Sequence, residues 1–203
     1  MPATGRGRMI AGRYELATAI GRGGMGEVWT AYDTRLDRRV ACKLLHPALL
    51  PTGTTGRSAV TRFRREARLT ARLEHPGVPA VFDVGTEDGS LYLVMQLVDG
   101  ADLGDVLAAR GRLPVDWAVA IAAQLAAVLA AAHAVSLVHR DLKPRNVMLS
   151  RGGTVRVLDF GVAALLEPES TRVTAATAGE ISSRAASAGG AVLVLPASLL
   201  LKS

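Results

Sequence analysis

The sequence predicts an α+β fold with two lobes: an antiparallel N-terminal sheet with one helix, followed by an incomplete, mainly helical C-terminal lobe. Three observations lead to this prediction. Apolar residues alternate along several short segments in the first half of the chain, which is typical of strands. From Gly100 onward the apolar period becomes helical. The 203 residues, 49% of them hydrophobic, suffice for one core or for two small lobes.

The elements of the sheet-containing lobe follow from the positions of apolar runs and turn residues. A helix is expected over residues 57–73, which contain no Pro or Gly and carry apolar residues at helical spacing. Strands are expected at 14–20, 28–32, 40–45, 80–84 and 91–97, separated by Gly-rich, Asp-rich or Arg-rich turns.

The second half predicts a short helix over 103–109 and a longer one over 115–135, with Asp116 as its N-cap. The longer helix is nearly all apolar and is therefore expected to be buried. Two strand pairs are expected beyond it, 137–138 with 147–149, and 155–158. The predicted divisions are a disordered basic leader (1–12), the sheet-containing lobe (13–97), part of the helical lobe (98–177) and a divergent tail (178–203).

Composition excludes several classes of protein. The net charge of +6 comes mainly from arginines spread along the chain among acidic residues, which argues against a nucleic-acid partner. Cys42 is the only cysteine, so no internal disulfide or cysteine-ligated metal is expected, as in the reducing cytoplasm. The first eight residues lack the apolar core of a secretory signal. The apolar stretch 191–201 contains Pro196 and has about half the length of a membrane-spanning helix, so no transmembrane segment is predicted.

A glycine-rich stretch lies between the first two predicted strands. Residues 20–28 read Ile-Gly-Arg-Gly-Gly-Met-Gly-Glu-Val and fit the pattern G-x-G-x-x-G-x-V, in which backbone amides can lie over phosphates. A dinucleotide-binding fold would need a helix after this loop, whereas a strand is predicted here. A glycine-rich hairpin without a ligand is equally compatible with this motif alone. The candidate phosphate-binding glycines are Gly21, Gly23, Gly24 and Gly26.

A lysine on the third predicted strand is a candidate for binding phosphates. Lys43 follows Val-Ala-Cys and is one of only three lysines in this arginine-rich chain, which indicates a site that needs a compact point charge. Glu66 on the following helix is its expected ion-pair partner. A surface carboxylate paired along its own helix is the alternative interpretation of Glu66.

The strongest signal is residues 138–146, Val-His-Arg-Asp-Leu-Lys-Pro-Arg-Asn, which match H-R-D-L-x-x-x-N at every defined position. Phosphoryl transfer needs a carboxylate that orients the attacking hydroxyl, oxygen ligands for Mg²⁺, and cations on the transferred group. Asp141 suits the first role, and Lys143 can neutralise the γ-phosphoryl. Asn146, the only asparagine in the chain, can bind a metal ion, and the Asp159-Phe160-Gly161 motif adds a second metal-binding carboxylate.

In this order, the motifs resemble those of the protein kinase superfamily, most closely the Ser/Thr kinases of high-GC bacteria, over about residues 13–177. The resemblance implies a bilobal protein-kinase-like fold that uses ATP and Mg²⁺ to phosphorylate Ser/Thr hydroxyls of proteins, and Lys143 is typical of the Ser/Thr members. Arg140 implies control by a phosphorylated activation segment, with Thr174 and Thr177 as candidates, although ordinary loop residues are equally compatible. The implied adenine site comprises Ile20, Val28 and Ala41 above the ring, Met148 below it, Met95 at the back, and the backbone of residues 96–98, including Gln96 and Val98.

The sequence departs from that family after Gly161, where a Gly-Thr element, an Ala-Pro-Glu motif and further helices are expected and not found. A reading-frame shift near Ala175 is the favoured interpretation of this truncated pattern, with a gene fragment or a genuine short variant as alternatives. Two functions follow: an active Ser/Thr protein kinase, or a catalytically weak or silent module that binds ATP or a partner.

Overall fold

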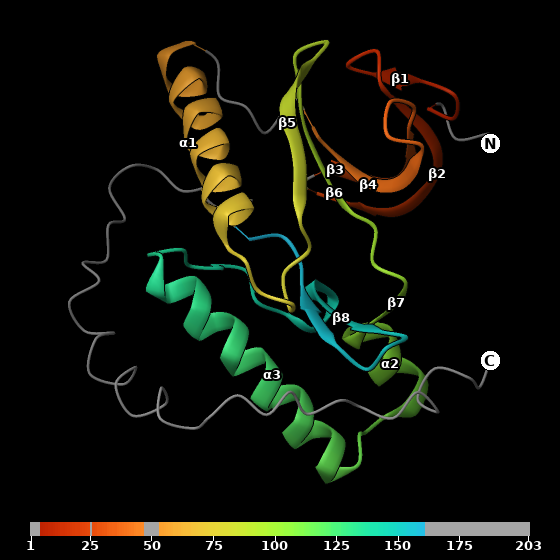
Figure 1. Cartoon of the computed structure of the whole chain (residues 1–203), viewed down its shortest axis with the longest axis vertical. Coiled ribbons are helices and arrows are strands. Elements are labelled where there is room, and N and C mark those ends of the chain that lie inside the picture. Colours follow the sequence, from red (N-terminus) through yellow and green to blue (C-terminus); the bar gives the residue numbers. More distant parts are fainter. Residues whose placement is uncertain (1–4, 25, 47–52, 161–203) are drawn as a thin grey trace.

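The structure is a computed structural model that describes residues 5–24, 26–46 and 53–160. Figure 1 shows a sheet-rich N-terminal lobe above a C-terminal lobe of helices and short strands, which confirms the predicted α+β organisation. The strands are β1 Met9–Ile10, β2 Tyr14–Gly23, β3 Gly26–Asp33, β4 Arg38–Leu45, β5 Val81–Glu87, β6 Ser90–Gln96, β7 Gly100–Asp102, β8 Val147–Ser150 and β9 Val155–Val157. The helices are α1 Gly53–Arg72, α2 Leu103–Arg110, α3 Val115–Ala134 and a 3₁₀ turn at Pro144–Asn146.

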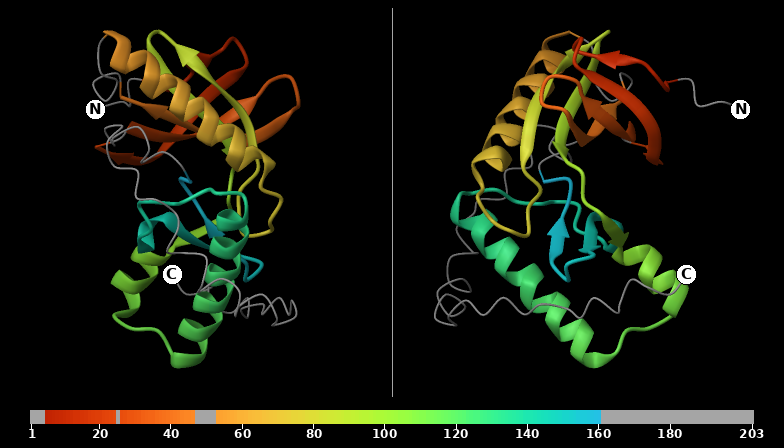
Figure 2. Two further views of the ribbon diagram at one scale, coloured as in Figure 1. Left: turned by 90° about the vertical axis from the view of Figure 1, so that its left-hand side faces the viewer. Right: turned by 45° about the vertical axis from the view of Figure 1, so that its right-hand side comes forward.

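The N-terminal lobe is one antiparallel sheet of six strands in the order β1-β2-β3-β4-β6-β5, with α1 against one face (Figures 1 and 2). Side chains alternate between the two faces of β4 because the strand period is two. Ala41 and Leu45 therefore pack toward Phe63 of α1, whereas Val40 and Cys42 join the core on the opposite face. Lys43 shares the face of Ala41 and Leu45, so the sheet itself directs this cation toward α1.

The predicted disordered leader is wrong for its last residues. Met9–Ile10 forms β1 and pairs with β2, and Ile10 is fully buried beside Trp29. Two residues with positive φ, Ala11 and Gly12, turn the chain between the strands. A two-residue strand is too short to show an alternating pattern, so the sequence did not reveal it.

Helix α3 differs from its prediction in two ways. Pro114 occupies the N-cap position and no side chain caps the helix, so Asp116 lies inside the first turn instead of capping it. The expected burial is confirmed for one side only, where Ile121, Val128 and two alanines are buried, whereas the side chain of Val115 is 75% exposed. By length and composition alone, α3 would also pass as a membrane-spanning helix, yet it supplies buried residues to both cores of the C-terminal lobe.

Residues 137–138 are not the predicted strand. Ser136 adopts a positive φ of 59°, and the amide of Leu137 donates to the carbonyl of Ala132 at 2.9 Å, which closes the end of α3 as in a Schellman motif. Leu137 is therefore buried by the helix end and not by a strand ladder. The real partners of β8 are β7 and β9. At Gly100 a Cβ would overlap the carbonyl group of Leu149, so glycine permits the close approach of β7 to β8.

Candidate active site

The predicted phosphate loop is the hairpin that joins β2 to β3. Gly23 pairs with Gly26 across the hairpin, Gly24 lies between them, and residue 25 lies outside the described residues. Gly26 has φ 143°, and an added Cβ would overlap the carbonyl oxygen of Leu44 on β4. Glycine is therefore required here for β3 to lie against β4, whereas a Cβ at Gly23 or Gly24 would meet open space.

Three of the predicted adenine-contacting residues lie together. Ala41 pairs with Met95 across β4 and β6, and Val28 packs against the cluster to which both belong, on the face toward α1. Ile20 is exposed near the tip of the hairpin, and Met148 is half-buried on β8 in the other lobe. The structure therefore places one apolar side of the predicted adenine site in the N-terminal lobe and the other in the C-terminal lobe.

The segment between β6 and β7 joins the lobes. The amide of Gln96 donates to Ala80 at 2.8 Å, so this N–H is already engaged, and the Gln96 side chain accepts from Arg156 of β9 at 3.5 Å. Within the described part of the chain, the backbone of Val98 makes no hydrogen bond. The backbone N–H and C=O of Val98 are therefore available to bind a purine, whereas the N–H of Gln96 is not.

The predicted Lys43–Glu66 ion pair is not formed between the described side chains. Lys43, which is almost fully buried, places its Nζ 2.7 Å from Oδ2 of Asp159, and Glu66 lies 3.9 Å from the guanidinium of Arg140. A buried ammonium group needs a close counter-charge, and the carboxylate that follows β9 is nearer than the one on α1. Both carboxylates thus lie beside cations, and the partner of Lys43 is Asp159 instead of the predicted Glu66.

The catalytic loop brings Asp141, Lys143 and Asn146 together. Lys143 Nζ donates to Oδ2 of Asp141 at 2.6 Å, and the side-chain amide of Asn146 donates to the Asp141 carbonyl at 2.7 Å and to its carboxylate at 3.2 Å. The hydrogen bond from Lys143 lowers the pKa of Asp141, against a smaller opposing effect of burial. Asp141 is therefore an ionised carboxylate at neutral pH, as a group that orients a hydroxyl must be.

His139 holds this loop in place, a role that the sequence did not assign. Its Nε2 lies 2.7 Å from the carbonyl of Leu158, so Nε2 carries the proton and donates, while Nδ1 accepts from the amide of Asp141 at 3.4 Å. The imidazole also packs against Phe160, with ring centroids 4.8 Å apart. The signal was present in the His-Arg-Asp motif, but the partners of His139 are distant in sequence and only folding shows them.

Two residues with unusual backbone conformations flank these contacts. Arg140 has φ 65° and Asp159 has φ 61°, although neither is glycine. Such conformations cost on the order of 1–3 kcal/mol each and persist where the surrounding structure enforces them. Here Arg140 follows His139 and Asp159 precedes Phe160, the two residues whose rings pack against each other.

The predicted metal ligands lie on adjoining backbone segments. The amide of Leu158 donates to the carbonyl of Asn146 at 2.8 Å, which brings Asp159 next to the catalytic loop. Because Asn146 donates through its nitrogen, its amide oxygen remains as an acceptor. Residues 5–24, 26–46 and 59–160 contain no cluster of three or more His, Cys, Asp or Glu side chains suited to a metal. One amide oxygen and one carboxylate fit Mg²⁺, which binds few protein ligands and completes its shell with phosphates and water.

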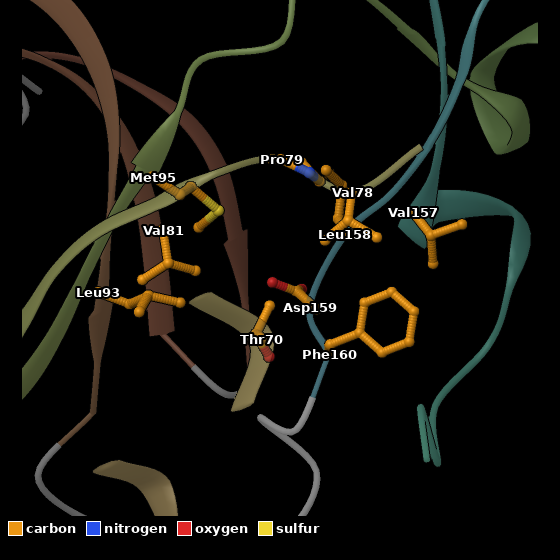
Figure 3. Close-up of a pocket in the computed structure, with 10 residues that line it drawn as sticks. All are labelled: Thr70, Val78, Pro79, Val81, Leu93, Met95, Val157, Leu158, Asp159 and Phe160. Atoms are coloured by element: carbon orange, nitrogen blue, oxygen red, sulfur yellow. The ribbon is translucent and has the colours of Figure 1, made fainter. Parts of the chain in front are cut away.

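A narrow pocket lies behind these groups, between α1, the N-terminal sheet and the end of β9. Figure 3 shows the carboxylate of Asp159 and the side chains of Thr70 and Met95 facing this space. The pocket therefore extends from Met95 on β6 to Asp159 and Phe160 after β9. Its lining residues are Thr70, Val78, Pro79, Val81, Leu93, Met95, Val157, Leu158, Asp159 and Phe160.

Comparison with known proteins identifies this arrangement. The family model described as the protein kinase domain matches residues 14–183. The chain belongs to the protein kinase family. It is 43% identical over 166 residues to the serine/threonine-protein kinase PknA of Mycobacterium tuberculosis, covering 79% of this chain and 38% of PknA. It is 39% identical over 168 residues to the serine/threonine-protein kinase PrkC of Bacillus subtilis, covering 83% of this chain and 25% of PrkC.

Solved structures of this kinase family agree with the fold. The M. tuberculosis PknI kinase domain superposes with a TM-score of 0.71 at 35% identity, covering 80% of this chain and 63% of that chain. The predicted resemblance to bacterial Ser/Thr kinases and the predicted fold are thus confirmed. The chain spans less than two fifths of the length of PknA and about a quarter of PrkC. Gly161, Thr174, Thr177 and the predicted tail lie outside the described residues.

Proposed function

We propose that this chain transfers the γ-phosphoryl group of ATP to Ser/Thr hydroxyls of proteins. The observation that carries the proposal is the position of the Asp141 carboxylate, hydrogen-bonded by both Lys143 and Asn146. Names of relatives at about 40% identity support the same activity. The protein substrate is proposed only as a class, a polypeptide with an accessible hydroxyl.

The described side chains divide the chemistry among them. Asp141 accepts a hydrogen bond from the attacking hydroxyl and aligns its oxygen with the γ-phosphorus. It takes the hydroxyl proton as the new P–O bond forms, while the bond from the γ-phosphorus to the β–γ bridging oxygen breaks and ADP leaves with that oxygen. Lys143, already hydrogen-bonded to Asp141, places a positive charge where the γ-phosphoryl oxygens gather negative charge. Lys43 binds the non-transferred phosphates, for which it must exchange at least part of its contact with Asp159.

Mg²⁺ would be held by Asn146 and Asp159, where it would neutralise phosphate charge. The adenine would lie between Val28, Ala41 and Met148, with the backbone of Val98 as its hydrogen-bonding partner. The glycines of the β2–β3 hairpin leave room for phosphates under the backbone. A cytoplasmic location is proposed as well, supported by the free, buried Cys42.

The test is phosphoryl transfer from γ-labelled ATP, compared between the wild-type chain and Asp141→Asn. We expect the variant to lose activity by about 10²–10⁴-fold, the usual contribution of a positioned base. Asp88→Asn, in the exposed turn between β5 and β6, is the matched control and should retain full activity. Wild-type incorporation no greater than that of Asp141→Asn would overturn the proposal.

The second candidate function is a catalytically weak or silent module that binds ATP or a partner. It is favoured by the Lys43–Asp159 contact, which joins two groups that turnover must separate, at least in part. In that case Mg-ATP would raise the melting temperature without turnover, because a ligand that binds the folded state stabilises it by mass action. The thermal shift and the phosphoryl transfer are therefore measured on the same samples: a shift with transfer indicates the kinase, and a shift without transfer indicates the silent module.

A further inference from the structure

One side of α3 is apolar and has no described element against it. The exposed residues of this side are Val115, Val119, Ala122, Ala123, Ala126 and Ala130, which lie within one stripe of a 3.6-residue helix, here called the outer face of α3. Figures 1 and 2 show the described strands and α2 on the other side of this helix. Val115 and Val119 are 75% and 59% exposed. Soluble proteins rarely leave a contiguous apolar stripe of this length in water.

No charged side chain interrupts this face. Asp116 lies at its edge in the first turn and His133 at its last turn, and between them the stripe carries only alanine and valine. The opposite side of α3 is already occupied, since Ile121 packs on β8 and β9, and Val128 packs beside Phe160. The outer face therefore needs a second apolar partner that brings no charge with it.

The described part of the chain ends next to this helix. Phe160 is buried in the same cluster as Val128 and Ala132, so the 43 residues that follow, 161–203, start at α3. Residues 191–201 are the one long apolar run among them and carry no charged side chain. The 30 residues 161–190 can span up to ~100 Å, far more than the ~30 Å length of α3. The run can therefore reach any position on the outer face.

We propose that residues 191–201 pack on the outer face of α3 of the same chain and cover it. Alanine side chains allow another backbone to come close, and the leucines of the run then supply the apolar area that the alanines lack. The run of 11 residues would span ~36 Å if extended, enough for the whole face. This intramolecular contact is independent of the proposed kinase activity.

Disulfide trapping tests the contact in the full chain. Cys42 is fully buried, so it does not compete for disulfide formation. Cross-linking can therefore be assigned to the introduced pair of cysteines. Ala122→Cys or Ala126→Cys is combined with Ser198→Cys, and Ala17→Cys with Ser198→Cys is the control, because Ala17 is an exposed alanine on β2. We expect at least one α3 pair to cross-link within the chain about tenfold faster than the control, at a rate independent of protein concentration.

Three outcomes would overturn the proposal. Cross-linking equal to that of the Ala17 control would show that the run is elsewhere. Cross-links between chains, rising with protein concentration, would assign the face to a second copy. Protection of Ala126→Cys from alkylation only in the presence of lipid vesicles would assign it to a membrane surface.

A second measurement does not require two cysteines to lie at the distance and angle that a disulfide needs. Alkylation of Ala126→Cys is followed in the otherwise unchanged chain and with Leu193→Asp and Leu195→Asp added. These two changes lie outside the described cores, and they should speed alkylation several-fold if the run covers α3, with no change at Ala17→Cys. Equal rates with and without the two aspartates would contradict the inference.

Discussion

Leu137→Ala is expected to destabilise the C-terminal lobe strongly. Leu137 is fully buried against Val128, Val157 and Phe160 at the end of α3, two residues before His139. Removing three carbons forfeits ~2.4 kcal/mol of transfer free energy at ~0.8 kcal/mol per methylene. A residual cavity of ~50 Å³ would add ~1.2 kcal/mol. The free energy of unfolding should therefore fall by about 3–4 kcal/mol.

Urea denaturation followed by circular dichroism measures this change. With a slope of about 2 kcal/mol per M, the midpoint should fall by about 1.5–2 M. Val138→Ala is the matched control, because its side chain is 48% exposed and the same bookkeeping gives a loss below about 1 kcal/mol. Equal losses for the two variants, or a loss below about 1 kcal/mol for Leu137→Ala, would refute the assignment of Leu137 as the residue that seals the end of α3.

Three further predictions concern the glycine-rich hairpin, an ion pair and the catalytic base. Gly26→Ala should cost about 1–3 kcal/mol in unfolding free energy, because φ is 143° and the added Cβ overlaps β4, whereas Gly23→Ala should cost less. Asp33→Asn should lose about 1–3 kcal/mol at pH 7, since it breaks a buried, bidentate hydrogen bond to an arginine. Because the pKa of Asp33 is lowered from 3.8 to about 2, this wild-type advantage should disappear in denaturation curves as the pH falls through that interval. Lys143→Ala should move the acidic limb of the kcat/KM profile to higher pH, because Lys143 lowers the pKa of Asp141; an unmoved limb would contradict that coupling.

The part of the active site that could be predicted from the sequence is the part formed by residues close together along the chain. Asp141, Lys143 and Asn146 lie within six residues, and a short loop is sufficient to bring them together. The strands around Lys43 were predictable for a similar reason, because period-two alternation fixes which face each side chain takes. Local patterns thus determined both the catalytic loop and the sheet.

The failures of prediction all involve contacts that no local pattern encodes. The backbone amide of Leu137 bonds to the end of α3, a helix ending that uses Ser136 where a glycine would have been the visible signal. The burial of α3 was predicted from its apolar composition, but composition cannot say how many sides a helix covers. A helix that is apolar all round can be half-buried when only one side has a partner.

The two observed ion pairs, Lys43 with Asp159 and Arg140 with Glu66, show how the two lobes depend on each other. Lys43 belongs to the N-terminal sheet and Asp159 to the segment after β9, while Glu66 belongs to α1 and Arg140 to the catalytic loop. Both contacts therefore cross from one lobe to the other. Pairing Lys43 with Glu66 would replace these two inter-lobe contacts by one contact within the N-terminal lobe, and Asp159 would then be released from Lys43. The partner chosen by Lys43 is thus coupled to whether Asp159 is available for a metal ion, and this coupling requires both lobes to be folded together.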